Sequence, residues 1–246
     1  MSTEQTGQDI VIVAAKRTPM GGFQGALSEV ASPVLAATAI KGLIAQTGIS
    51  VDAVDEVLMG CVLPAGLGQA PARQATLGAG LPLSVGATTV NKVCGSGMKT
   101  VMLAHDLIKA GSSQVVVAGG MESMSQAPYL LDKARSGMRM GHGKVMDHMF
   151  LDGLEDAYTG GAMGTFAQKT ADDFGLTREQ MDDFALGSLE KANAAINSGA
   201  FKDEVVPVTI STRRGDVTVE IDEQPGNARP EKIPTLRPAF TKDGTI

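Results

Sequence analysis

Aromatic side chains and cysteine are scarce in this sequence. Its 246 residues include no tryptophan, two tyrosines, seven phenylalanines and two cysteines. A core with so few rings must rely on Val, Ile, Leu, Met and Ala, and the thirty glycines suggest tight turns between strands and helices. Two cysteines without an obvious pairing pattern argue against a disulfide-stapled secreted domain and fit a reducing compartment.

Long apolar runs and an excess of positive charge are also missing. No stretch approaches the apolar length of a membrane span, and residues 1–9 lack the basic start and apolar centre of a signal peptide. The formal net charge of −6 and an isoelectric point near 5.1 argue against nucleic acid or an anionic membrane as the main partner. We therefore expect a soluble cytoplasmic protein with neither nucleic acid nor membrane as a partner.

Metal-binding and nucleotide-binding motifs are absent as well. The three histidines, at positions 105, 142 and 148, have no second ligand at metal-binding spacing, so no metal site is predicted. There is no Walker loop, and the glycines of residues 60–68 do not match a dinucleotide-binding fingerprint. Residues 94–98 lack the first glycine of a GxSxG nucleophile elbow, which makes Ser96 a weak candidate nucleophile.

Strands and helices alternate through the first half of the sequence. The strands are expected at residues 10–15, 56–63, 87–93 and 114–118, and the helices at residues 32–48, 70–79 and 98–111. Ser32 is the expected N-cap of the first helix, with Pro33 in its first turn. Because the strands are apolar throughout, we predict a layered α/β domain over residues 1–120, with its sheet covered on both faces.

The second half loses this pattern. Residues 121–163 are rich in Met and Gly and show little periodicity, which suggests loops. A helix that begins with a capping box at residues 177–180 is expected to bury one side. That side carries Met181, Phe184, Ala185, Ser188 and Leu189. Residues 205–211 and 216–221 predict a β-hairpin. We therefore predict a second domain, of α+β type, over residues 121–246.

Cys94 lies between an expected strand and an expected helix. The helix places Met98, Val101, Met102, His105 and Ile108 on one face. The free N–H groups and the dipole at a helix N-terminus favour a thiolate, and Gly95 and Gly97 leave the nearby backbone open to a ligand. This arrangement suits an activated nucleophile. The alternative is a cysteine that packs as a small apolar side chain, and we assign Cys61, which lies inside an apolar run, to that role.

Five segments carry a family resemblance. They are VAAKRTP at residues 13–19, GQAPARQ at 68–74, NKVCGSGMK at 91–99, AGGMESMS at 118–125 and LRPAF at 236–240. In this order they resemble the thiolase family, and specifically its acetyl-CoA acetyltransferases. The resemblance implies a thiolase-like αβα first domain that bears the nucleophile, followed by an inserted α+β loop domain that covers coenzyme A.

The resemblance also assigns roles to individual residues. Cys94 would carry the acyl group as a thioester, and its backbone N–H would help to form an oxyanion hole. By position, Leu154, Met163 and Phe240 would contact the pantetheine arm, and Arg229 and Lys232 would meet the phosphorylated adenosine end. Ala162 stands where other members have His, so no contact of that His is carried over. Coenzyme A and acetyl-CoA are implied as substrates, and no tightly bound cofactor is expected.

The sequence ends at Ile246, whereas family members continue into a second, similar domain. That domain supplies a His in a Gly-His-Pro motif and a Cys in a Cys-x-Gly-Gly-Gly motif. The sequence is therefore interpreted as an N-terminal part of an enzyme that reversibly condenses two acetyl-CoA to acetoacetyl-CoA and CoA, without the acid/base half. The alternatives are a thiolase for longer 3-ketoacyl chains, and a non-catalytic binding or scaffold protein with the same half-fold.

Partners are implied by the same resemblance. We expect a homo-oligomer, either a dimer or a tetramer, in which residues 114–118 take part in the interface and residues 68–74 lie near the site of a neighbouring subunit. A complementary polypeptide that carries the C-terminal half is a further expected partner, and the small-molecule partner is an acyl-CoA.

Overall fold

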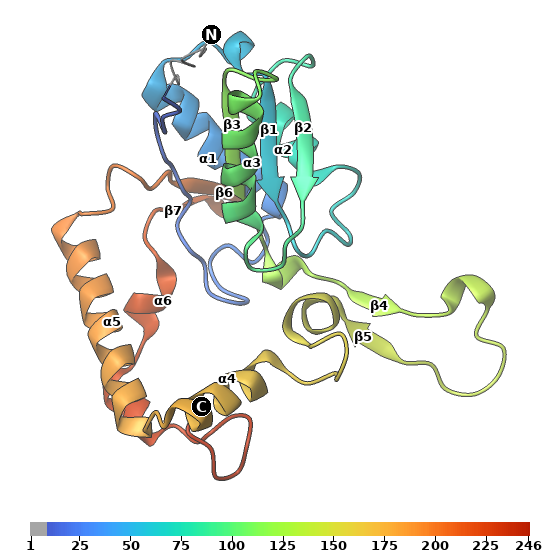
Figure 1. Ribbon diagram of the computed structural model, residues 1–246, viewed down its shortest axis with the longest axis vertical. Coiled ribbons are helices and arrows are strands. Elements are labelled where there is room, and N and C mark those ends of the chain that lie inside the picture. Colours follow the sequence, from blue (N-terminus) through green and yellow to red (C-terminus); the bar gives the residue numbers. More distant parts are fainter. Residues whose placement is uncertain (1–8) are drawn as a thin grey trace, which may run out of the picture. The chain divides into compact units, whose positions relative to one another are not determined.

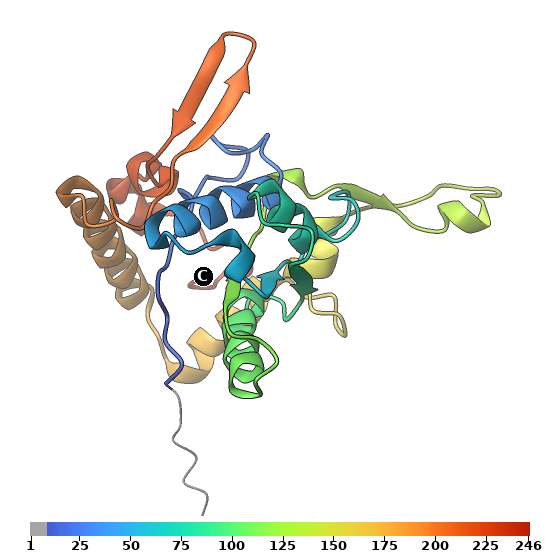
Figure 2. The ribbon, with the colours of Figure 1, turned by 90° about the horizontal axis from the view of Figure 1, so that it is seen from above.

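The computed structural model describes residues 9–246, which form two compact units (Figures 1 and 2). Unit 1 contains the described part of Met1–Thr18 together with Ala31–Val62 and Leu67–Glu122. Unit 2 contains Pro19–Val30, Leu63–Gly66 and Ser123–Ile246. The change of unit after Glu122 lies close to the domain boundary expected at residue 120, but two segments of the first half belong to unit 2. The division into residues 1–120 and 121–246 stays a prediction.

Unit 1 is built on a three-stranded parallel sheet in the order β2-β1-β3. Its strands are β1 (Glu56–Gly60), β2 (Gly86–Val90) and β3 (Val116–Gly120). Glu56 stands opposite both Gly86 and Val116, so the three strands start in register. The central strand is buried from its second residue to its last, as an apolar strand covered on both faces should be.

Helices cover both faces of this sheet. Helix α3 (Ser96–Lys109) lies in front of the sheet in Figure 1, and α1 (Ser32–Thr47) and α2 (Pro71–Gly78) lie behind it. The short helix η1 (Val51–Ala53) precedes β1. The core cluster of buried residues consists of Ala36, Ile40, Val54, Val57, Met59, Cys61, Ala72, Ala75, Leu81, Val85, Val117 and Met121. None of these side chains is aromatic, as the composition predicts. The expected layered α/β class is confirmed.

Unit 2 is a mixture of loops, helices and two hairpins. Its elements are η2 (Met124–Gln126), β4 (Tyr129–Leu131), η3 (Ala134–Ser136), β5 (Val145–Asp147), the π-helix η4 (Phe150–Leu154), α4 (Met163–Phe174), α5 (Arg178–Ser198), β6 (Val208–Thr212), β7 (Gly215–Val219), α6 (Glu223–Asn227) and η5 (Pro230–Thr235). The predicted hairpin is confirmed as the antiparallel pair β6–β7, which projects as a ribbon in Figure 2. The capping box at Thr177 and Gln180 is also present.

A strap of residues 19–30 is bound into unit 2 by carboxylates far along the chain. Asp222 accepts a hydrogen bond from the Met20 N–H at 2.9 Å. Glu223 accepts from the N–H groups of Gly22 at 2.8 Å and Ala26 at 2.9 Å. These backbone donors hold the pKa of Glu223 below its ordinary value, because they favour the charged carboxylate.

Four expectations about local structure are wrong. Residues 10–15 form no strand: Val11, Ile12 and Val13 are 70%, 81% and 78% exposed. Apolar composition gives a segment β-propensity, but a strand also needs a neighbour to hydrogen-bond with, and no described residue pairs with this segment. Helix α1 begins one residue earlier than expected, because Ala31 rather than Ser32 is its N-cap.

The other two corrections concern which helix face is packed. On α3 the expected face is open to solvent, with Met98 69% exposed, and the buried residues are Ser96, Thr100 and Ala104. On α5 Phe184 is 81% exposed. Periodicity finds an apolar face, but close packing against a sheet can require small residues instead.

No helix among the described residues combines the length and apolarity that crossing a bilayer requires.

Candidate active site

The turn that carries Cys94 is tight and strained. Strand β2 ends at Val90 and α3 begins at Ser96, so Cys94 lies two residues before the helix, where its side chain is exposed. Val93 has a φ of 47°, in the left-handed region. A β-branched residue rarely adopts this conformation, and such strain persists only where the surroundings enforce it.

Hydrogen bonds within the turn enforce this conformation. The Asn91 side-chain oxygen accepts from the Val93 N–H at 2.9 Å. Ser96 Oγ accepts from the Lys92 N–H at 2.7 Å and donates to the Val93 carbonyl at 2.6 Å. Ser96 is 4% exposed and fully engaged, so it supports the turn that presents Cys94. From the sequence, Ser96 was considered only as a weak candidate nucleophile, and its support of the turn was not predicted.

Glycines let the start of α3 approach the sheet closely. A Cβ at Gly60 would lie 2.7 Å from the backbone of both Ser96 and Gly97. Gly120 meets Gly97 in the same way, with 3.2 Å between its would-be Cβ and the Gly97 Cα. Thr100 Oγ1 lies 2.9 Å from the Gly119 carbonyl on β3. These approaches require glycine at positions 60 and 120, whereas a Cβ at Gly97 would make only ordinary contacts, at 3.6 Å from the Gly120 backbone. The expected role of Gly97 beside a ligand stays a prediction.

Cys61 belongs to the core, as expected. It is 1% exposed at the end of β1, and its Sγ lies 3.7 Å from Glu122 Oε1. The same carboxylate accepts from the Val62 N–H at 2.8 Å, which ties the chain after β1 to the chain after β3. Of the two cysteines, only Cys94 is open to a substrate.

Unit 2 brings together the three residues expected to contact the pantetheine arm. Glu155 and Ala162 form an isolated antiparallel bridge, with Leu154 just before it at the end of η4 and Met163 just after it at the start of α4. The Phe240 ring packs on Gly164, where a Cβ would overlap the ring atoms. Leu154 is half-buried, and Met163 and Phe240 are both 43% exposed. The bridged segment of residues 154–164 and the distant Phe240 thus supply one small apolar surface.

The loop between Leu154 and Met163 is closed by Asp156. Its carboxylate accepts from the Thr159 hydroxyl at 2.7 Å and from the Thr159 N–H at 2.8 Å. These bonds hold the pKa of Asp156 below its ordinary value, with the Thr159 hydroxyl as the largest cause. The ionised carboxylate therefore keeps the bridged residues in place at neutral pH.

The buried His148 contacts η4 through a hydrogen bond to Asp152. His148 is 4% exposed, its Nδ1 lies 2.6 Å from Asp152 Oδ2, and its Nε2 accepts from the Ala65 N–H at 3.3 Å. With Nε2 as an acceptor, the N–H of the ring is on Nδ1 and faces Asp152. His148 thus ties Ala65 to the turn that carries Leu154.

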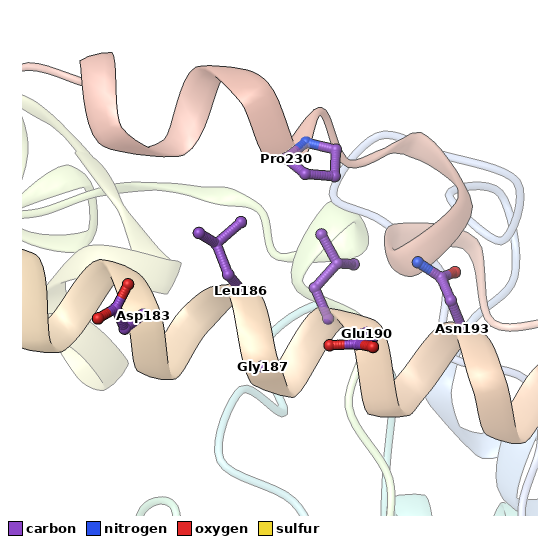
Figure 3. A pocket seen from close by; sticks show the side chains of 7 residues that line it. Asp183, Leu186, Gly187, Glu190, Asn193 and Pro230 are labelled. Carbon is purple, nitrogen blue, oxygen red and sulfur yellow. The ribbon is translucent and has the colours of Figure 1, made fainter.

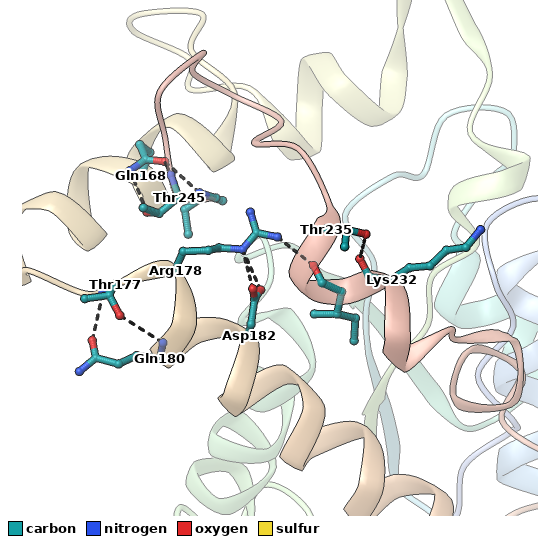
Figure 4. Close-up of polar contacts among 10 residues, drawn as sticks. Gln168, Thr177, Arg178, Gln180, Asp182, Lys232, Thr235 and Thr245 are labelled. Carbon is teal, nitrogen blue, oxygen red and sulfur yellow. Dashed lines mark hydrogen bonds and ion pairs between the residues drawn. The ribbon is translucent and has the colours of Figure 1, made fainter.

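The two cations expected at the adenosine end lie at and next to η5. Arg229 and Lys232 are exposed. Their segment is fixed by Arg178, which binds both oxygens of Asp182 at 2.8 and 2.9 Å and donates to the Ile233 carbonyl at 2.9 Å. Figure 4 shows the Lys232 side chain pointing away from this ion pair, free to meet an anion.

A groove of about 650 Å³ runs between α5 and Pro230. It is lined by Asp183, Leu186, Gly187, Leu189, Glu190, Asn193 and Pro230. Figure 3 shows Leu186 directed toward Pro230, with Asp183 and Glu190 on the helix below. Two carboxylates repel phosphate, so this groove does not suit the charged end of coenzyme A.

Among residues 9–246, no three His, Cys, Asp or Glu side chains gather as metal ligands.

The sequence and the fold were compared with known proteins. A family model described as the thiolase N-terminal domain matches residues 10–246. Curated relatives called acetyl-CoA acetyltransferase are 52% identical in Escherichia coli and 49% identical in Pseudomonas aeruginosa, each over 241 residues. Each of these matches covers 97% of this chain and 61% of the relative.

The fold comparison agrees. A solved structure of acetyl-CoA acetyltransferase from Syntrophomonas wolfei superposes with a TM-score of 0.91 at 39% identity, over 96% of this chain and 59% of that chain. The chain therefore spans about three-fifths of the length of these relatives. A family match over nearly every described residue and a close structural likeness together show that this chain belongs to the thiolase family.

Proposed function

We propose that this chain takes an acetyl group from acetyl-CoA onto Cys94, as the nucleophile-bearing part of an acetyl-CoA acetyltransferase. The observation that carries the proposal is the exposed Cys94 at the tip of an enforced turn, in a chain of the thiolase family. The names of the relatives give the acyl group and its carrier.

The proposed step exchanges one thioester for another. The Cys94 sulfur bonds to the acetyl carbon, the bond from that carbon to the CoA sulfur breaks, and the proton lost by Cys94 ends on the CoA sulfur. Because the bonds made and broken are of the same kind, the step is nearly isoenergetic and runs both ways. A serine would give a more stable ester and would oppose the reverse reaction.

Leu154, Met163 and Phe240 are the proposed contacts of the pantetheine arm, and Arg229 and Lys232 the proposed contacts of the adenosine phosphates. The apolar surface around Gly164 and the exposed cations at η5 support this division. The complete reaction, two acetyl-CoA to acetoacetyl-CoA and CoA, needs a base for the methyl proton, and a positioned base contributes about 10²–10⁴-fold. We propose that a C-terminal thiolase domain supplies this base, so that the chain alone does not condense acetyl-CoA.

The test distinguishes acetyl transfer to Cys94 from the condensation of two acetyl-CoA. Acetyl-CoA is incubated with the chain, and intact mass followed by peptide mapping locates any acetyl group. We expect one acetyl group on Cys94, none in Cys94→Ala, and no acetoacetyl-CoA. Acetylation that persists in Cys94→Ala contradicts the assigned nucleophile, and condensation by the chain alone places the base within residues 1–246.

The chain is also proposed to form a homo-oligomer through the region of residues 114–118. Within the described residues β3 is an edge strand, with backbone groups open to pairing. Light scattering tests this proposal, and a folded monomer at high concentration contradicts it.

A further inference from the structure

Gln168 is a buried amide whose hydrogen-bonding capacity is filled. It is 5% exposed on α4. Its Oε1 accepts from the N–H groups of Thr245 at 2.8 Å and Ile246 at 3.0 Å. Its Nε2 donates to Asp172 Oδ1 at 2.8 Å and to Thr245 Oγ1 at 3.1 Å. A side-chain amide offers two lone pairs and two N–H groups, and Gln168 uses all four, as Figure 4 illustrates for the Thr245 side.

These bonds lead to Phe240. The Ile246 backbone oxygen accepts from the Ala239 N–H at 2.8 Å, which closes residues 239–246 into a turn. Gln168 binds one end of this turn, and the Phe240 ring at the other end packs on Gly164. Gly164 and Gln168 are four residues apart, so they lie on the same face of α4. The turn is therefore clamped to one helix face at both ends.

We propose that Gln168 is a positioning residue that holds the Phe240 ring on Gly164, next to Met163 in the sequence, and so fixes one wall of the surface for the pantetheine arm. The inference rests on the proposed function, because Phe240 matters only if that arm binds there. It assigns the role to a residue that touches no substrate and acts through residues 239–246.

The hydrogen bonds require an amide at this position rather than a carboxylate. In Gln168→Glu the two acceptor bonds to Thr245 and Ile246 can remain, but both donors are lost. The new carboxylate then faces Asp172 at hydrogen-bond distance, and two like charges in contact repel. A second change, Asp172→Asn, returns a donor to the pair and removes the repulsion, so the double variant should regain the clamp.

The experiment measures how the initial rate of Cys94 acetylation depends on acetyl-CoA concentration. Losing a hydrogen bond that involves a charged group shifts an equilibrium by about tenfold or more. We expect Gln168→Glu to raise the half-saturating concentration about tenfold with little change in the maximal rate. Gln168→Glu/Asp172→Asn should recover most of this loss. Lys169→Gln, which removes an exposed ion pair on the same helix, is the matched control and should behave as the wild type.

Two further experiments test whether Gln168 acts through Phe240. S-acetylpantetheine, which has the arm but no adenosine, should show the same fold-loss in Gln168→Glu as acetyl-CoA. Adding Gln168→Glu to Phe240→Ala should cost nothing more, because residues that act as a unit are not additive. A loss confined to acetyl-CoA, or additive losses, would overturn the proposal.

Hydrogen exchange separates this proposal from the proposed function. The amides of residues 239–246 should exchange faster in Gln168→Glu and return toward wild-type rates in the double variant. If the wild-type chain forms no acetyl thioester, the proposed function fails, and Phe240 has no arm to hold in place. If acetylation is normal and exchange at residues 239–246 is unchanged in Gln168→Glu, the positioning role alone is wrong.

Discussion

The turn that carries Cys94 and the apolar surface around Gly164 are organised in opposite ways. The turn is local, since Asn91 and Ser96 hold Val93 in its left-handed conformation within a few residues of Cys94. The apolar surface is assembled from residues 154–164, where Asp156 closes the loop, and from the distant Phe240, whose segment is hydrogen-bonded to Gln168. A short motif can thus fix the geometry around Cys94, whereas the surface proposed for the pantetheine arm depends on tertiary contacts.

The largest expected effect is the loss of acetylation in a variant that still folds. Cys94→Ala should abolish acetylation and change the free energy of unfolding by less than about 0.5 kcal/mol, because the side chain is exposed. Cys61→Ala should keep the acetylation but lower the free energy of unfolding by about 1 kcal/mol, because it leaves a small cavity.

Peptide mapping after limited iodoacetamide treatment should find Cys94 labelled before Cys61, and the reverse order would contradict the assignment of Cys94 as the reactive thiol.

Substitution of Gly60, which lies on β1, should disturb the turn that carries Cys94. Gly60→Ala introduces a Cβ 2.7 Å from the backbone at the start of α3, so we expect a loss of about 1–3 kcal/mol in urea unfolding. The rate of Cys94 alkylation should change as well. Gly187→Ala is the matched control: nothing lies within 4 Å of its Cβ, and helix propensity predicts a gain of up to about 1 kcal/mol. Equal effects at the two positions would refute the packing role of Gly60.

A third change should damage only the apolar surface. Gly164→Ala must displace the Phe240 ring. We expect the half-saturating concentration of acetyl-CoA to rise about tenfold, in the range that a misfitted apolar group costs a binding site. Alkylation of Cys94 by iodoacetamide should keep its wild-type rate. If alkylation and acetyl-CoA dependence change together, the two regions are not independent.

The smallest expected effect is a loosening of unit 2 in acid. The pKa values of Asp156 and Glu223 are lowered in the folded chain, so their contributions to stability are complete above the ordinary carboxyl pKa, about 4. They are lost as the pH falls through the lowered values. The urea midpoint should therefore fall between about pH 5 and pH 2, and less steeply in Asp156→Asn. An identical slope in this variant would show that Asp156 has no such role.

Much of this protein follows from the sequence alone. Apolar runs 56–63 and 114–118 predict buried parallel strands, because a strand covered on both faces has no polar side. The position of Cys94 before a helix, together with the five family segments, indicates the nucleophile. These features are local, so each is readable from a few neighbouring residues.

Other features were settled only by the tertiary structure. Residues 10–15 have strand composition but no described neighbour to pair with. The packed side of α3 consists of small residues, because Gly60 and Gly120 let the start of the helix approach the sheet. Nothing in the sequence signals that Ser96 supports the turn or that Gln168 has the proposed positioning role, since the function of a hydroxyl or an amide depends on its hydrogen-bond partners. Hydrogen bonds and close packing join residues that are far apart in the chain, so the physical reason for these features lies in the fold.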